Sequence, residues 1–162
     1  MIFTSMGEFK NELINVSLAC SRFLDVDISD EEVVYISGLI PRTISIDSFY
    51  KMELNGKKLT YLTDMLYYFK HGDIPWTKES QRSYHQYIGD YCLLVYSLFD
   101  RYLNRKRRAD LRDFYINCGK SAYKSLSTLI DDELFGDLSH DFKECSQVIK
   151  HSLDILKKRH RH

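Results

Sequence analysis

The sequence predicts an all-α protein: a single-domain bundle of five to six helices with a long central helix near residues 77–104. Three observations support this fold class. Apolar residues recur at intervals of three and four along most of the chain, which is the period of one face of a helix. Capping residues precede several of these runs. The chain has 162 residues, 44% of them hydrophobic, so residues 1–162 can bury one core without disulfides or metals.

Two amphipathic segments begin the chain. The first helix is expected over residues 5–23, where one face carries Met6, Phe9, Leu13, Val16, Cys20 and Phe23. "SDEE" at 29–32 is a capping box, in which the Ser29 hydroxyl accepts the Glu32 N–H and the Glu32 carboxylate accepts the Ser29 N–H. A short helix is expected to follow and to end at Ile40, because the next residue is proline.

Two structures are open for the segment 42–56. Asn55-Gly56 is the strongest short hairpin signal, and the same glycine is suited to end a short helix that starts near Asp47. Clean alternation is missing on both sides of this turn, so the helix is favoured over the hairpin. Another helix is expected over 57–70.

The central helix contains the most aromatic stretch of the chain, "YHQYIGDYCLLVYSLF" at 84–99. It is expected to be capped by Thr77 and to run to Asn104. At about 100° per residue, its aromatic and aliphatic side chains share one broad face, whereas Asp90 and Ser97 lie on the other side. A face this wide indicates a helix that several neighbours contact.

Two further helices complete the prediction. One covers 109–130, and its apolar stripe includes Cys118, Ala122 and Leu126. The acidic stretch "DDELFGDL" that follows is expected to be a loop, after which Ser139 caps a last helix to Lys158. The basic tail at 157–162 is expected to be disordered.

Tyrosines of the two long helices form the main candidate site. The favoured interpretation is an aromatic core, in which each buried hydroxyl finds a hydrogen-bond partner. The alternative is a pocket for a small planar or acidic ligand between helices 77–104 and 109–130, lined by His85, Asp90, Tyr91, Tyr115 and Tyr123. Glycine inside a helix costs up to about 1 kcal/mol relative to alanine. Close helix packing is therefore predicted at Gly89, Gly119 and Ala122, with room for a ligand at the glycines as the alternative.

Two clusters of charged or metal-ligating residues suggest other kinds of binding. The connection after the central helix contains Arg105, Lys106, Arg107 and Arg108, which could hold phosphate groups. The whole chain has 23 basic and 23 acidic residues, and this neutral balance argues against nucleic acid. His140, Glu144 and His151 share a helix face that points away from the apolar stripe, so no metal site is expected.

The absence of several sequence motifs narrows the possible classes of function and cellular location. The four cysteines form no CxxC pair and are expected to be buried, reduced thiols, which favours the cytoplasm. The start of the chain has no basic residues followed by an apolar run, and no stretch approaches the roughly 20 apolar residues that span a bilayer. We expect neither a signal peptide nor a membrane partner. No GxGxxG, HExxH, GxSxG or glycine-rich phosphate loop supports an enzyme or a cofactor.

"GDYCLLVYSLF" at 89–99 contains a Gly-Asp, apolar-run, Phe pattern, and "DFYINCGKSAY" at 113–123 contains an aromatic-Tyr, Gly, Ala-Tyr pattern. In this order they resemble an uncharacterised family of small helical bacterial proteins. The resemblance covers roughly residues 84–126, and Ser97 stands where that family would have glycine. It implies no activity. It implies that a set of residues belongs together: Gly89, Asp90, Tyr115, Gly119, Ala122 and Tyr123.

The sequence favours a protein-interaction or regulatory module, with another protein or a second copy of the chain as partner. One alternative is the tyrosine- and aspartate-lined ligand pocket. A weaker alternative is nucleic-acid or phosphate binding through Arg105–Arg108. No catalytic residue, metal or cofactor is assigned.

Overall fold

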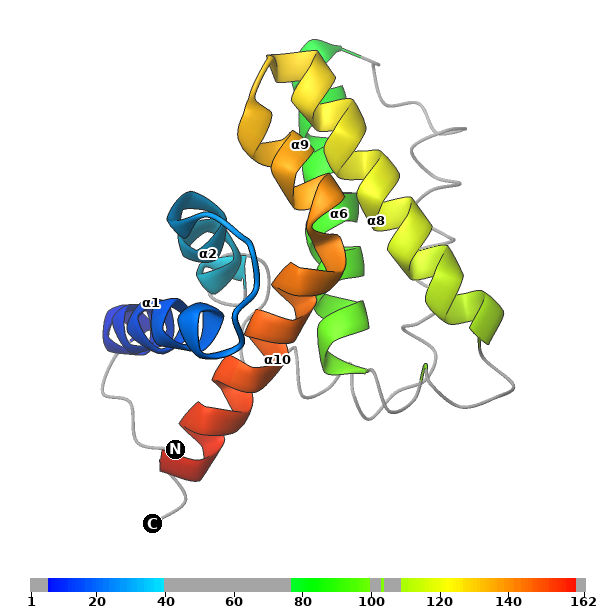
Figure 1. The fold of residues 1–162 in the computed structure, drawn as a ribbon. Helices are drawn as coiled ribbons and strands as arrows, with labels where there is room; N and C mark the ends of the chain where they lie inside the picture. The colour runs from blue at the N-terminus through cyan, green and yellow to red at the C-terminus, as the bar shows by residue number, and fades with distance from the viewer. Residues whose placement is uncertain (1–5, 40–76, 100–102, 104–108, 160–162) are drawn as a thin grey trace.

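The computed structural model describes residues 6–39, 77–99, 103 and 109–159, which form six helices and no strands (Figure 1). The predicted all-α class is confirmed. The segments 42–56 and 57–70 and the basic cluster Arg105–Arg108 lie outside the described residues. The helices are α1 (Met6–Phe23), α2 (Asp30–Ser37), α6 (Lys78–Leu98), α8 (Ala109–Ile130), α9 (Glu133–His140) and α10 (Phe142–Arg159).

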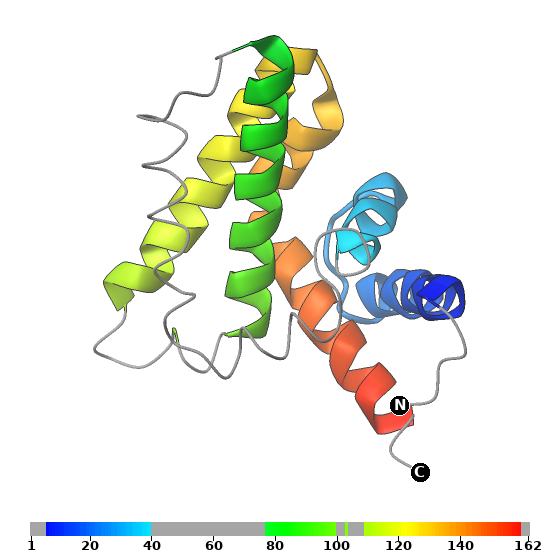
Figure 2. The ribbon, with the colours of Figure 1, turned by 180° about the vertical axis from the view of Figure 1, so that it is seen from behind.

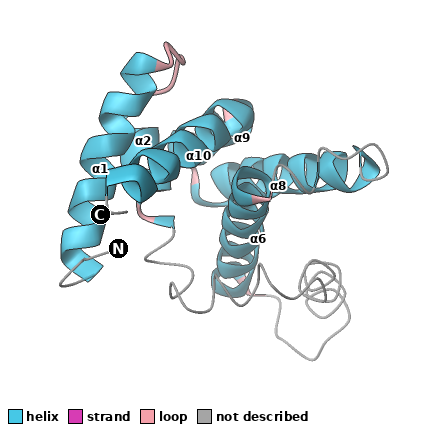
Figure 3. Cartoon of the chain, turned by 90° about the horizontal axis from the view of Figure 1, so that it is seen from below, coloured by secondary structure: helices cyan, strands magenta, loops and turns pink. Residues whose placement is uncertain are grey.

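The helices are arranged on the two sides of α10. On one side, α6 and α8 run antiparallel as a long pair, and α9 folds back along α8 (Figures 1 and 2). On the other side, α1 and α2 pack against each other and against α10, as the view from below shows (Figure 3). The last helix therefore joins the early part of the chain to the pair that carries the aromatic stretch.

The start of α2 follows the sequence prediction. The Ser29 hydroxyl accepts the Glu32 N–H at 3.1 Å, and the Glu32 carboxylate accepts the Ser29 N–H at 3.1 Å, so the capping box is confirmed. The helix ends at Ser37 rather than at Ile40. Gly38 is the C-cap, and its N–H bonds to the Tyr35 carbonyl at 3.1 Å.

The central helix begins as predicted and ends early. The Thr77 hydroxyl accepts the Ser80 N–H at 3.1 Å and caps α6. The prediction that the helix runs to Asn104 is wrong, because Phe99 leaves helical backbone angles at φ −108° and ψ 26°. Neither glycine nor proline marks this end in the sequence, so local signals do not reveal it.

The prediction of an acidic loop after α8 is wrong. Residues Glu133–His140 form α9, and the Asp132 carboxylate caps it by accepting the Leu134 N–H at 3.0 Å. Phe135 and Leu138, three residues apart, are buried on one face. Ser139 is not a cap, since its hydroxyl donates to the Lys120 carbonyl of α8 at 2.8 Å. The last helix, α10, continues through Arg159, so three residues assigned to a disordered tail are helical.

The core is centred on α6. Every residue from Ile88 to Val95 is buried, which confirms a helix contacted by several neighbours. Asp90 and Ser97 are only 4% and 1% exposed, so the expected polar face of α6 is also inside the protein. The reason is that α8 covers one side of α6 while α10 and the Tyr35 side chain of α2 contact it from elsewhere.

Candidate functional site

A buried carboxylate organises the polar groups of the core. One oxygen of Asp90 accepts the Tyr123 hydroxyl at 2.6 Å and the Tyr35 hydroxyl at 2.8 Å. The Gln86 amide donates to the Tyr35 oxygen at 3.2 Å. Hydrogen bonds to an ionised acceptor are short and strong, and they satisfy hydroxyls that could not otherwise be buried cheaply. This network joins α2, α6 and α8.

Tyr123 is the inner end of this network. Its side chain is fully buried and stacks on Phe135 of α9 with ring centroids 6.1 Å apart. Burial raises the pKa of Tyr123 well above its ordinary value of 10, so its hydroxyl stays a donor to Asp90. A Cβ at Gly89 would lie 2.6 Å from the Tyr123 ring, so the missing side chain of Gly89 makes room for the tyrosine.

The structure separates the five predicted ligand residues. Asp90, Tyr91, Tyr115 and Tyr123 are all buried, at 4% exposure or less. His85 lies at the surface end of α6, where it lines a groove with α8. Of the predicted packing residues, Gly119 meets Phe142 and Cys92, because a Cβ there would lie 2.5 Å and 2.9 Å from them. Ala122 forms part of the groove floor.

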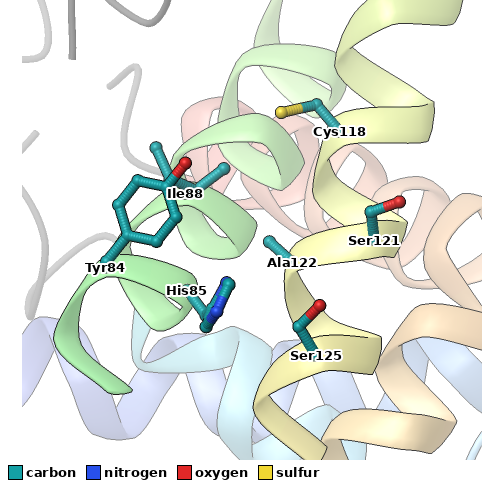
Figure 4. Close-up of a pocket in the computed structure, with 7 residues that line it drawn as sticks. All are labelled: Tyr84, His85, Ile88, Cys118, Ser121, Ala122 and Ser125. Carbon is teal, nitrogen blue, oxygen red and sulfur yellow. The ribbon is translucent and has the colours of Figure 1, made fainter. Parts of the chain in front are cut away.

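The groove is the candidate functional site. It has a volume of about 150 Å³ and opens to solvent between α6 and α8 (Figure 4). Its walls come from residues one helical turn apart on each helix, which brings them to one face. The lining residues are Tyr84, His85 and Ile88 from α6 and Cys118, Ser121, Ala122 and Ser125 from α8. None of them is an acid, a lysine or an arginine.

Partial burial sets the charge state of this site. Burial lowers the pKa of His85 below its ordinary value of 6.5, so the imidazole is neutral at pH 7 and both donates and accepts hydrogen bonds. Burial also raises the pKa of the Tyr84 phenol, which stays protonated. The groove therefore offers neutral hydrogen-bonding groups above an apolar floor of Ile88 and Ala122.

Cys118 lines one end of the groove, and the buried Cys92 thiol interacts with it. This interaction lowers the pKa of Cys118 below its ordinary value of 9.0. Burial raises the pKa of Cys92 well above the same value. Cys92 has no exposed surface, whereas Cys118 is half-buried and faces the groove. The expectation of four buried thiols therefore holds for Cys20, Cys92 and Cys145 but not fully for Cys118.

Glu32 is a second buried carboxyl, to which the sequence assigns only a capping role. Its side chain is 2% exposed and lies beside Asp141, at the junction of α9 and α10. The Cys145 S–H donates to its free oxygen at 3.7 Å. Burial is the main cause that raises the pKa of Glu32 to about 7. The capping box gave no sign of this, since most capping glutamates face solvent.

The histidines of the predicted solvent face remain apart from any metal geometry. His140 and His151 are exposed, and His140 pairs with Asp141 at 2.8 Å. Within the described part of the chain, no group of three or more His, Cys, Asp or Glu side chains could hold a metal ion. No helix described here is long and apolar enough to cross a bilayer.

Fold and groove together define an all-α bundle with a neutral interhelical groove. Comparison of the chain with protein-family models, curated proteins and solved structures finds no match. The resemblance to a family of small helical bacterial proteins therefore stays a prediction.

Proposed function

We propose that this chain is a small-molecule-binding module whose ligand occupies the groove between α6 and α8. The observation that carries the proposal is the lining: neutral donors and acceptors from His85, Ser121 and Ser125 surround an apolar floor. Binding sites for small molecules combine an apolar surface with a few polar groups that fix orientation. The sequence also predicts a ligand pocket between these two helices, but it places that pocket among the buried tyrosines. The site proposed here lies at the outer edge of the same helix pair.

The lining also defines the class of ligand. A cavity of about 150 Å³ accommodates a molecule the size of one aromatic ring. Because no lining side chain is an acid, a lysine or an arginine, and burial keeps His85 and Tyr84 neutral, an uncharged ligand is favoured. A single ring with an amide or hydroxyl substituent matches this shape and chemistry.

Benzamide is a suitable probe for the proposal. About ten non-hydrogen atoms at about 0.3–0.5 kcal/mol each correspond to a millimolar Kd. Titration followed by ¹H–¹⁵N NMR is expected to shift the backbone amides of Ser121, Ala122 and Ser125. Replacing His85 by Ala is expected to weaken binding about fivefold, the equivalent of one hydrogen bond of about 1 kcal/mol.

A matched pair of variants separates the groove from the rest of α8. Ser125 is exposed and lines the groove, so Ser125→Trp fills the site without disturbing the core. Lys124 is an exposed neighbour outside the lining, and Lys124→Trp is the control. Binding should be lost in the first variant and kept in the second. Shifts scattered over the molecule, or equal in both variants, would contradict the proposal.

The interaction role favoured by the sequence has less support. Among the described residues, the large exposed apolar side chains are Phe23, Val34 and Phe114, on α1, α2 and α8. Isolated apolar side chains are ordinary on protein surfaces and do not define a docking site. Protein interaction stays a prediction, as does phosphate binding by Arg105–Arg108. We propose a cytoplasmic location, which the four free cysteines support because a reducing compartment keeps thiols unpaired.

A further inference from the structure

We propose that Cys92 and Cys118 form a peroxide-responsive thiol pair, in which Cys118 is oxidised from the groove and Cys92 then closes a disulfide between α6 and α8. This modification site goes beyond ligand binding and does not depend on it. Three features of the structure support the pair: the packing of Cys92 beside Cys118, unequal access to solvent, and a close approach of the two helices.

The packing of the two helices places Cys92 beside Cys118. Cys92 lies one turn beyond Ile88 on α6, and Cys118 lies one turn before Ala122 on α8, so both extend the stripes that form the groove. Next to Cys118, Gly119 has no side chain to separate the helices, since a Cβ there would lie 2.9 Å from the Cys92 Cβ. This close approach brings Cys92 next to Cys118, and the two thiols interact.

Unequal access assigns a different role to each thiol. Cys118 lines the groove, where a small hydroperoxide can reach its sulfur (Figure 4). Cys92 has no exposed surface. The interaction with Cys92 lowers the pKa of Cys118 and so favours its thiolate, which is the form that attacks peroxides. Cys118 is therefore the attacking thiol and Cys92 the resolving thiol.

The reaction balances with hydrogen peroxide as the oxidant. The Cys118 thiolate attacks one peroxide oxygen, the O–O bond breaks, and hydroxide leaves, so that the sulfur becomes a sulfenic acid. The Cys92 sulfur then attacks the Cys118 sulfur. The S–S bond forms as the S–O bond breaks, and the departing hydroxide takes the Cys92 proton and leaves as water. Two thiol sulfurs lose two electrons in total, and these reduce the peroxide.

Cys20 and Cys145 provide internal controls, because both are buried outside the groove. After treatment of the folded protein with a small excess of hydrogen peroxide, intact mass spectrometry is expected to show the loss of two hydrogens. Peptide mapping is expected to join Cys92 to Cys118, while the other two thiols remain free. Cys118 should react about tenfold or more faster than either control, since thiolate character sets the rate.

Two variants test the order of the steps. In Cys92→Ala, the sulfenic acid has no resolving thiol, so dimedone is expected to label Cys118. In Cys118→Ala, Cys92 should stay reduced because peroxide does not reach it. The double variant Cys20→Ala, Cys145→Ala should form the disulfide at the wild-type rate.

Two results would overturn the inference: oxidation of all four thiols at similar rates in the folded protein, or sulfinic acid at Cys118 beside a free Cys92. Neither result would bear on benzamide binding, which is measured on the reduced protein. A failure of benzamide binding would likewise leave the thiol pair intact.

Discussion

At the scale of single residues, Asp90 has the most demanding position in the protein. A carboxylate that is 4% exposed is stable only where hydrogen bonds replace the water it has lost. The hydroxyls of Tyr35 and Tyr123 supply two of these bonds, and they come from two other helices. The carboxylate in turn satisfies the hydroxyl of Tyr123, which has no exposed surface. The three residues form one structural unit.

Replacing Asp90 by Ala should lower the free energy of unfolding by about 3 kcal/mol, because it leaves the buried Tyr123 hydroxyl without its acceptor. Tyr123→Phe in the same background should cost much less than it does alone. A double-mutant cycle by urea denaturation measures this coupling, expected at about 1.5–3 kcal/mol. A loss below 1 kcal/mol for Asp90→Ala would show that the network contributes little to stability.

At the scale of helices, the approach of α6 to α8 is governed by residues that lack side chains. Gly89 leaves room for the Tyr123 ring, and Gly119 leaves room for Phe142 and Cys92. Phe142 is fully buried, so its ring cannot swing away from an added group. The same approach holds the two thiols together and sets the width of the groove.

Gly119→Ala should destabilise the protein by on the order of 1–3 kcal/mol, because the new methyl group overlaps the Phe142 ring. Gly119→Leu should prevent folding. Gly136→Ala in α9 is the matched control, since its Cβ would approach only the Ser127 hydroxyl, at 3.2 Å, and alanine favours the helix. Thermal unfolding measures all three variants. An unchanged melting temperature for Gly119→Leu would contradict the packing account.

At the scale of the whole molecule, two buried carboxyls connect the early helices to the late ones. Asp90 accepts a hydrogen bond from the Tyr35 hydroxyl of α2. Glu32 of α2 lies beside Asp141 and Cys145 at the start of α10. The capping bonds from Ser29 lower the pKa of Glu32, and burial together with Asp141 raises it to a greater extent. The net pKa of about 7 means that this junction gains and loses a proton near neutral pH.

The stability of the fold should therefore depend on Glu32 in a defined pH window. Its pKa is about 7 in the folded chain and 4.5 ordinarily, so the folded state binds the proton more tightly. This contribution is fully present below pH 4.5 and is lost as the pH rises through 7. The expected decrease in the free energy of unfolding is on the order of 1–3 kcal/mol.

Glu32→Gln isolates this effect, because glutamine keeps the capping acceptor without a titrating proton. The variant should gain stability relative to the wild type as the pH rises from 5 to 8. Urea denaturation at several pH values measures the difference, with the exposed neighbour variant Glu31→Gln as control. Parallel pH profiles for wild type and Glu32→Gln would rule out the buried carboxyl as a source of pH dependence.

Part of the candidate site could be read from the sequence. Helical period places Tyr84 and Ile88 on the same face of α6, and Cys118 and Ala122 on the same face of α8. The sequence places His85 at the edge of that face, and in the structure it lines the groove. The sequence could not predict that these two stripes face each other. The relative rotation and register of two helices depend on how their side chains interlock.

Local chemistry in the sequence determined the all-α class, the capping of α2 and α6, and the extent of α8 at 109–130, because caps and helical period act within a few residues. Only the tertiary structure decided that Asp90 and Glu32 are buried and that Cys92 meets Cys118. Tyr35 is 55 positions from Asp90, and Cys145 is 113 positions from Glu32. Contacts at such separations form through packing of the whole chain, so no local pattern encodes them.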